Sequence, residues 1–289
     1  MKQFIKYNLI YLSLSISLLY TLVLIVDNGL LKTDDNVFGD WNRLLNKKIT
    51  DSLVIVGNSR AKVHFNTEII EKKTGLSSYN LGRDATNLYL QEIMINTVLE
   101  YATPKYIVLV LDIGSFKKND EIFEKHQFLP YLNKSTIYNT LLHIDPSIQI
   151  EKKLPFIKYR GRFETVFLGI KSNIYDVNNY SKIKGFFGSN ENWNSDFDNF
   201  KLKMGDEKII LSQKEIDESL NLLKKIIRKC DRSNVKIIFC QTPRYFELNR
   251  YFPQKKFIDS KIKMIAETNG INYIDFSYDE DLSFNKSFF

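Results

Sequence analysis

The sequence has few of the residues that bind metals or form covalent cross-links. Its 289 residues include three histidines and two cysteines, Cys230 and Cys240. Two cysteines at this spacing match neither a metal site nor a disulfide framework. We interpret both as core residues, Cys230 on the apolar face of a helix and Cys240 at the end of a strand. We therefore expect no metal and no cofactor.

The sequence also lacks blocks of like charge. The net charge is +7, but the lysines that produce it are spread along the chain, and no nucleic-acid-binding motif accompanies them. A solvated surface, or attraction to anionic polymers of a cell surface, explains this charge better than nucleic-acid binding. With 44% hydrophobic and 26% charged residues, the chain can bury a full core and is not disordered.

One segment contains no charge at all. It runs from Leu9 to Val26 and is long enough to cross a bilayer, which takes about 17 to 25 residues. Lys2 and Lys6 precede it and aspartates follow it from Asp27 onwards, which predicts an amino terminus inside and a body outside. No small-x-small cleavage pattern follows Val26, which favours an uncleaved anchor over a signal peptide. A buried core helix is the third interpretation, although the segment is apolar all round.

The rest of the chain alternates short apolar strands with amphipathic helices. Strands are expected at 53–56, 78–81, 106–111, 235–240 and 272–276, and helices at 67–73, 86–101, 212–231 and 257–269. The clearest helix begins with a capping box of Ser212 and Glu215. This order predicts an α/β fold, namely a flavodoxin-like three-layer α/β/α domain with a parallel sheet of about five strands.

These patterns divide the chain into three parts. Residues 1–27 form a membrane anchor, 28–50 a polar connector with a short helix around 41–45, and 51–289 the α/β domain. Between 113 and 211 the alternation stops, and aromatic residues, among them Trp193, interleave with Asn and Lys. A crossover of this length predicts a helical insertion, which we expect over the carboxyl edge of the sheet. The aromatics fit a platform for carbohydrate or acyl chains, or simply the insertion's own core.

The first strand of the domain ends at a serine. Four apolar residues, Leu53 to Val56, are followed by Gly57-Asn58-Ser59-Arg60, which is typical of a buried strand and the turn that ends it. Ligands bind at the carboxyl edge of open α/β sheets, so Ser59 is a candidate nucleophile. A turn in which serine caps the next helix is the alternative interpretation.

Four blocks together carry a family resemblance. Gly57-Asn58-Ser59-Arg60 is followed by Asn80-Leu81-Gly82-Arg83, by a strand ending in Asp112 and by a strand running into Thr242-Pro243. In order and spacing this resembles the SGNH/GDSL hydrolase superfamily, and in particular its membrane-anchored bacterial members associated with cell-envelope polymers. The resemblance covers about 51–276, apart from the insertion.

The resemblance implies roles for individual residues. Ser59 would be the nucleophile of an acyl transfer, and its own N–H and that of Gly82 would donate to the oxyanion. The family's third donor is usually an Asn side chain, whereas this strand ends in Asp112, which cannot donate when ionised; Asn87 or a residue of the insertion could replace it. Arg60, Asn87 and Asp112 are the expected substrate-binding residues, although Arg60 could equally form a salt bridge.

The base that the resemblance implies is missing from the sequence. The family uses a His in an Asp-x-x-His block after the last strand, and here no histidine follows His143. His64, His126 and His143 are the remaining candidates. The apolar tail ending in Phe288 and Phe289 leads us to expect a further segment that carries the Asp and the His.

Two functions follow. One is an esterase or O-acyltransferase that acts outside the cytoplasm on a cell-surface polysaccharide or envelope polymer, through an acyl-Ser59 intermediate. The other is a non-catalytic, membrane-anchored module that serves binding or complex assembly.

Overall fold

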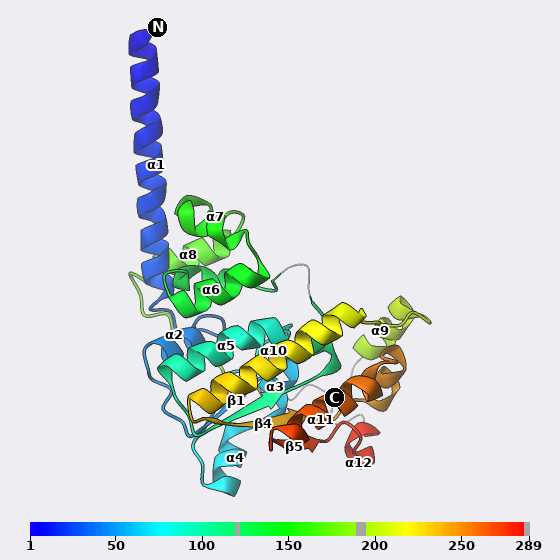
Figure 1. Cartoon of the computed structure of the whole chain (residues 1–289). Coiled ribbons are helices and arrows are strands. Elements are labelled where there is room, and N and C mark those ends of the chain that lie inside the picture. Colours follow the sequence, from blue (N-terminus) through cyan, green and yellow to red (C-terminus); the bar gives the residue numbers. More distant parts are fainter. Residues whose placement is uncertain (119–121, 189–194, 286–289) are drawn as a thin grey trace. The chain divides into compact units, whose positions relative to one another are not determined.

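A computed structural model describes residues 1–118, 122–188 and 195–285 of the chain. Trp193 and the apolar tail at Phe288 and Phe289, which enter the expectations above, lie outside these residues. The described residues form two compact units. One unit consists of residues 1–46 and 122–181, and we call it the anchor unit after the membrane anchor expected at its start. The α/β unit consists of the other described residues. Both are drawn in Figure 1.

The α/β unit contains a five-stranded, fully parallel sheet. Its strands are β1 (Leu53–Val56), β2 (Ser78–Asn80), β3 (Tyr106–Val110), β4 (Lys236–Gln241) and β5 (Asn272–Asp275). Their spatial order is β2-β1-β3-β4-β5, which is the flavodoxin-like order. The expected fold class is confirmed, and each expected strand is present to within one residue at either end.

Helices cover both faces of this sheet. The helices of the unit are α3 (Ser59–His64), α4 (Thr67–Thr74), α5 (Leu88–Tyr101), α9 (Asp196–Met204), α10 (Gln213–Arg232), α11 (Lys255–Thr268) and α12 (Glu280–Ser283), with 3-10 turns η1 (Ile113–Phe116) and η4 (Phe246–Tyr251). Alternate strand residues Ile55, Val108 and Val110 pack with Ala61 of α3 in one core cluster. On the other face α5 packs on β1 and α10 on β4, and the two helices lie side by side (Figure 1).

The helix ends follow the expected chemistry. Ser212 and Glu215 form the reciprocal capping box at the start of α10, and α4 ends at Gly75, whose φ of 71° is the left-handed conformation that glycine adopts at little cost. Cys230 of α10 and Cys240 of β4 are both buried and free. Their interpretation as core residues is therefore confirmed.

The described part of the anchor unit is mainly helical, with an isolated parallel β-bridge between Asp34 and Asn178. It contains α1 (Lys2–Leu30), α2 (Gly39–Leu45), α6 (Ser135–Ile144), α7 (Ile148–Lys153) and α8 (Phe163–Lys171), with 3-10 turns η2 (Lys125–Tyr131) and η3 (Pro155–Ile157). Its core is aromatic: Trp41 of α2 lies edge-on to Phe128 and donates its indole N–H to Gln127. Of the residues expected in an insertion at 113–211, those from 122 to 181 thus pack with the amino-terminal segment. Their expected place over the sheet edge stays a prediction.

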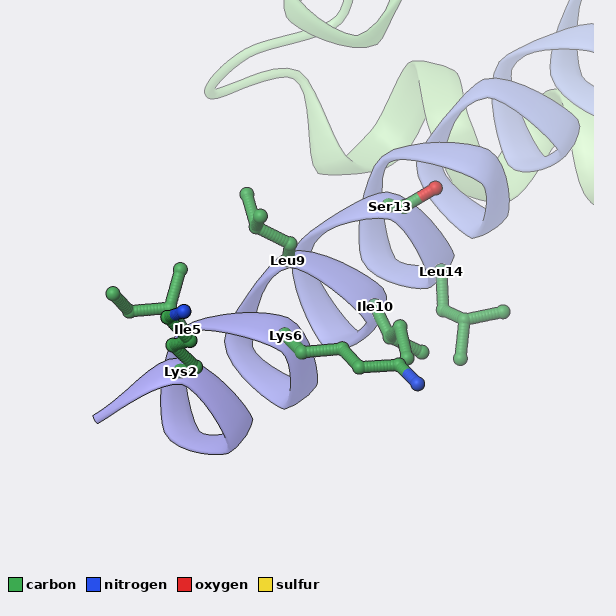
Figure 2. A pocket seen from close by; sticks show the side chains of 7 residues that line it. All are labelled: Lys2, Ile5, Lys6, Leu9, Ile10, Ser13 and Leu14. Carbon is green, nitrogen blue, oxygen red and sulfur yellow. The ribbon is translucent and has the colours of Figure 1, made fainter.

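The first helix is long and apolar enough to cross a membrane. It is a single helix that extends past the expected boundary at residue 27 to Leu30, and only four of its residues, all from Val23 onwards, are buried. Figure 2 shows side chains from its first fourteen residues, with Lys2 and Lys6 among apolar neighbours, and α1 alone supplies them. A signal sequence near the amino terminus also meets these criteria of length and composition, so the membrane anchor stays a prediction.

Candidate active site

Tight packing of the turn after β1 positions Ser59. A Cβ added to Gly57 would lie 2.7 Å from the Cβ atoms of both Ala61 and Val110, so only glycine fits between α3 and β3. The next residue, Asn58, is extended and caps α3, because its Oδ1 accepts a hydrogen bond from the Arg60 N–H at 3.0 Å. The cap is therefore Asn58 rather than Ser59.

Ser59 itself is the first residue of α3 and is exposed to solvent. Within the described part of the chain, neither its hydroxyl nor its N–H makes a hydrogen bond. Both groups are free to meet a substrate. The alternative interpretation, a serine that serves only to cap the helix, does not fit this geometry.

The site lies at the topological switch point of the sheet. β1 has β2 on one side and β3 on the other. The connection that leaves β1 (α3 and α4) and the one that leaves β3 (through α10) lie on opposite faces, and ligands bind at the carboxyl ends of the strands at such a point. Ser59 follows β1 and Asp112 follows β3. Arg60 links the two strand ends, because its Nε lies 3.2 Å from Asp112 Oδ2.

Asp112 is held by two arginines and a backbone amide. Its Oδ1 accepts hydrogen bonds from Arg244 Nη2 at 2.9 Å and from the Gly114 N–H at 2.8 Å. Burial alone would raise the pKa of Asp112, but the charges of Arg244 and Arg60 outweigh it and hold this pKa below its usual range. The carboxylate is therefore ionised at neutral pH and can only accept hydrogen bonds, as the sequence predicts.

Arg244 is a site residue that the sequence analysis missed. It directly follows Thr242-Pro243, at the carboxyl end of β4. This position at the end of a strand is the feature of the sequence that could have indicated a site residue. Its side chain is 4% exposed and lies over the Phe252 ring, with 4.5 Å between the guanidinium carbon and the ring centre. Among the described residues, its Nε and Nη1 make no hydrogen bond. Arg60 is more exposed, and its Nη1 donates to the Pro243 carbonyl at 2.7 Å.

Gly82 lies against the backbone of α3. A Cβ at this position would come within 2.3 Å of the Lys62 nitrogen and 2.7 Å of the Ala61 carbonyl carbon, so the contact requires glycine. Its N–H donates to Asn80 Oδ1 at 2.9 Å. To donate to an oxyanion, the Gly82 N–H would have to share its hydrogen with Asn80 Oδ1 or break this hydrogen bond. Its role as an oxyanion donor stays a prediction.

Asn87 caps the helix α5. Its Oδ1 accepts from the Leu90 N–H and its Nδ2 donates to the Lys117 carbonyl, each at 3.1 Å, and the residue is buried. Both ends of the amide thus have partners within the protein. Its expected contact with substrate stays a prediction.

The three histidines fall in different places. His64 is the last residue of α3, and desolvation by neighbouring atoms, followed by the charge of Arg60, lowers its pKa to about 4, although part of the residue is exposed. His126 lies edge-on to Phe38 within the anchor unit, and His143 is in the last turn of α6. The part of the chain that the structure describes holds no group of three His, Cys, Asp or Glu suited to a metal ion.

A second polar network, also missed from the sequence, lies beyond the ends of β4 and β5. Lys255 Nζ contacts Asp259 Oδ2 at 2.5 Å and Ser277 Oγ at 2.7 Å, and Asp259 Oδ1 accepts from Gln241 at 2.8 Å. All four residues are buried. The charge of Lys255 contributes to the low pKa of Asp112, and Asp259 offsets this charge within the network.

Solved structures resemble this chain at low similarity. No protein-family model matches the chain, and no characterised protein matches it in sequence. Among solved structures, a crystal structure described as a "putative acylhydrolase" from Bacteroides fragilis is similar at 10% identity, with a TM-score of 0.41, over 86% of this chain and 80% of that chain.

Proposed function

We propose that the chain is a membrane-anchored esterase or O-acyltransferase that acts outside the cytoplasm on a cell-surface polysaccharide or envelope polymer. The observation that carries this proposal is Ser59, whose hydroxyl and N–H are both free at the switch point of the sheet. A nucleophile must be exposed and must have a donor beside it for the developing negative charge. Ser59 meets both requirements.

The reaction proceeds through an acyl-serine. Ser59 Oγ attacks the carbonyl carbon of an ester, its proton passes to the histidine that the family resemblance implies as the base, and the oxyanion that forms accepts a hydrogen bond from the Ser59 N–H. The bond between that carbon and the leaving oxygen then breaks, and the leaving alcohol takes up the proton. Water completes the reaction in an esterase, and a hydroxyl of a second sugar completes it in an acyltransferase.

The arginines support a substrate that carries negative charge. Arg60 and Arg244 together bring two positive charges to one carboxylate, Asp112, so the cluster keeps a net positive charge. Two buried nitrogen atoms of Arg244, Nε and Nη1, have no hydrogen-bond partner among the described residues, while part of the Arg60 side chain is exposed. Phosphate or carboxylate groups of an envelope polymer would complement this charge and the fork geometry of a guanidinium.

A non-catalytic module is the second candidate, and two observations favour it. The Gly82 N–H already has an acceptor in Asn80, and the α/β unit's one histidine among its described residues, His64, is a weak base because its pKa is about 4. The same anionic polymer would then bind beside Arg60 without reacting.

Labelling of the membrane-inserted full chain with a fluorophosphonate distinguishes the two candidates. We expect slow labelling of the parent and none of Ser59→Ala, because only an activated serine reacts. Ser135→Ala is the matched control, since Ser135 is also exposed and also opens a helix, α6, and it should label like the parent. Equal labelling of parent and Ser59→Ala would remove Ser59 from the chemistry. No labelling of the parent would leave the non-catalytic module.

A further inference from the structure

The helix α8 buries small residues and exposes large apolar ones, which is the reverse of what is expected for a helix at a water-exposed surface. Its buried residues are Thr165 and Gly169, which are small. Phe163 and Phe167, one turn apart, are 83% and 69% exposed. A helix on a water-soluble surface turns its large apolar face inwards, and exposed apolar clusters mark interaction surfaces. We therefore expect the exposed face of α8 to contact an apolar environment.

α8 is fixed to α1 at the end of the uncharged stretch. A Cβ on Gly29 would lie 1.7 Å from the Gly169 carbonyl oxygen, so the two helices touch backbone to backbone. Just beyond α8, Asn173 donates to the Ile25 carbonyl at 2.7 Å. Ile25 belongs to the uncharged stretch, which ends at the next residue. α8 therefore meets α1 where α1 would leave the hydrocarbon of a membrane.

The turn before α8 is attached at the same level. Asp27 accepts hydrogen bonds from Lys158 Nζ at 2.7 Å and from the Tyr159 hydroxyl at 2.5 Å. A pocket of about 370 Å³ beside this pair is lined by Tyr20 and Leu24 of α1 and by Lys152 of α7, among others. Tyr20 lies about 9 Å before Val26 along the helix axis. Amphipathic helices lie about 5 to 10 Å deep at a membrane surface.

The residues around these contacts combine apolar exposure with positive charge. Other large apolar residues are exposed on both sides of α8 in the sequence. Ile150, Leu154 and Phe156 precede the helix, and Ile174 and Tyr175 follow it. Residues 148–175, which we call the juxtamembrane segment, contain six Lys and Arg and two Glu. Aromatic residues with Lys and Arg are the combination that favours the membrane–water interface.

We propose that the juxtamembrane segment lies on the leaflet that α1 leaves, with Phe163 and Phe167 among the acyl chains and its exposed Lys and Arg side chains at the lipid phosphates. These are Lys152, Lys153, Arg160, Arg162 and Lys171. The inference rests on the proposal that α1 spans the membrane. Its occupant is the lipid surface, because the exposed face continues directly from the membrane-crossing part of α1.

Probe accessibility in the full chain, reconstituted in phosphatidylcholine vesicles, tests this arrangement. An environment-sensitive probe is attached to Phe167→Cys, to His143→Cys on the exposed end of α6, or to Leu14→Cys within α1. The native thiols stay silent, because Cys230 and Cys240 are buried. Quenching is measured with aqueous iodide and with lipids that carry a nitroxide near the headgroup.

We expect the probe at 167 to be quenched by the nitroxide lipid and to be about threefold less sensitive to iodide than the probe at 143. Adding phosphatidylglycerol should strengthen the lipid quenching at low salt, and added salt should weaken that gain, as charge attraction requires. These results support the proposal.

Three results would overturn it. If the probe at 14 is quenched by lipid while the probe at 167 responds only to iodide, α1 spans the membrane and the segment does not touch it. If the probe at 167 is shielded from both quenchers, protein covers this face instead of lipid. If neither 14 nor 167 responds to lipid, the membrane anchor itself is refuted.

Discussion

Arg60 Nε and Asp112 Oδ2 lie 3.2 Å apart and join the end of β1 to the end of β3. Arg60 follows the end of β1 and Asp112 follows the end of β3, at the point where the strand order of the sheet reverses. Since Arg60 is the neighbour of Ser59, this ion pair also fixes the first turn of the helix that carries the candidate nucleophile. The stability of the ion pair and the geometry of the site are therefore linked.

Asp112→Asn should destabilise the α/β unit. The change leaves Arg60 and Arg244 facing each other without a carboxylate, and removing one partner of a buried pair costs about 3 kcal/mol. Because the pKa of Asp112 is lowered in the folded protein, its contribution is complete above the ordinary carboxyl pKa of about 3.9 and is lost as the pH falls below that value.

Denaturant unfolding of parent and variant from pH 7 down to pH 3 measures this difference, which we expect to shrink below about pH 4. Asp84→Asn is the control. Asp84 pairs with Lys62 at 2.6 Å but its side chain is 48% exposed, so its loss should cost less than about 1 kcal/mol. A difference between parent and Asp112→Asn that stays constant through pH 3 would contradict the assigned role of the carboxylate.

Gly82→Ala should cost about 3 kcal/mol of unfolding free energy, because the new methyl group meets backbone atoms of α3 that cannot rotate away. Gly75→Ala is the matched control. Gly75 has no atom within 4 Å of a new Cβ, but its φ is 71°, so the expected cost is the backbone strain alone, about 1 kcal/mol. Equal costs for the two variants would show that Gly82 is not in tight contact with α3.

His64→Gln should leave fluorophosphonate labelling within about twofold of the parent. An imidazole with a pKa of about 4 accepts a proton poorly at neutral pH. Initial labelling rates of His64→Gln, His126→Gln and His143→Gln, measured side by side, test this expectation. A loss as large as that of Ser59→Ala in any one of them would identify that histidine as the base.

A cysteine at Lys118 should react with an impermeant maleimide in intact cells. The charges around α1, with lysines before it and aspartates after it, favour a body outside the cytoplasm. The two native thiols should not interfere, since burial raises the pKa of Cys230 and of Cys240 to about 12. Labelling that occurs only after lysis would reverse the orientation.

The sheet could be predicted from the sequence because its strands are continuous apolar runs. β1 and β3 are buried on both faces, and such a continuous hydrophobic run is typical of a central strand in a parallel sheet. The capping box at Ser212 likewise follows from two residues three positions apart. Local patterns of this kind do not depend on the rest of the fold.

The partners of the site residues could not be predicted in the same way. Arg244 reaches Asp112 across 132 positions of sequence, and no local pattern distinguishes it from the other 40 Lys and Arg residues. Asn58 rather than Ser59 caps α3, and both residue types are good caps. In each case the tertiary contact determines which residue takes the role, and the local preference of the residue type does not.

The contacts of Asp27 also impose an order on biosynthesis. Its partner Tyr159 is 132 positions further along the chain. At a synthesis rate of about 5 to 20 residues per second, Tyr159 is made about 7 to 26 s after Asp27. β1, β2 and β3 are all synthesised within that interval, while β4 and β5 come later still. Neither unit is therefore complete before part of the other has been synthesised, and a ribosome that pauses between residues 112 and 159 would leave both of them incomplete.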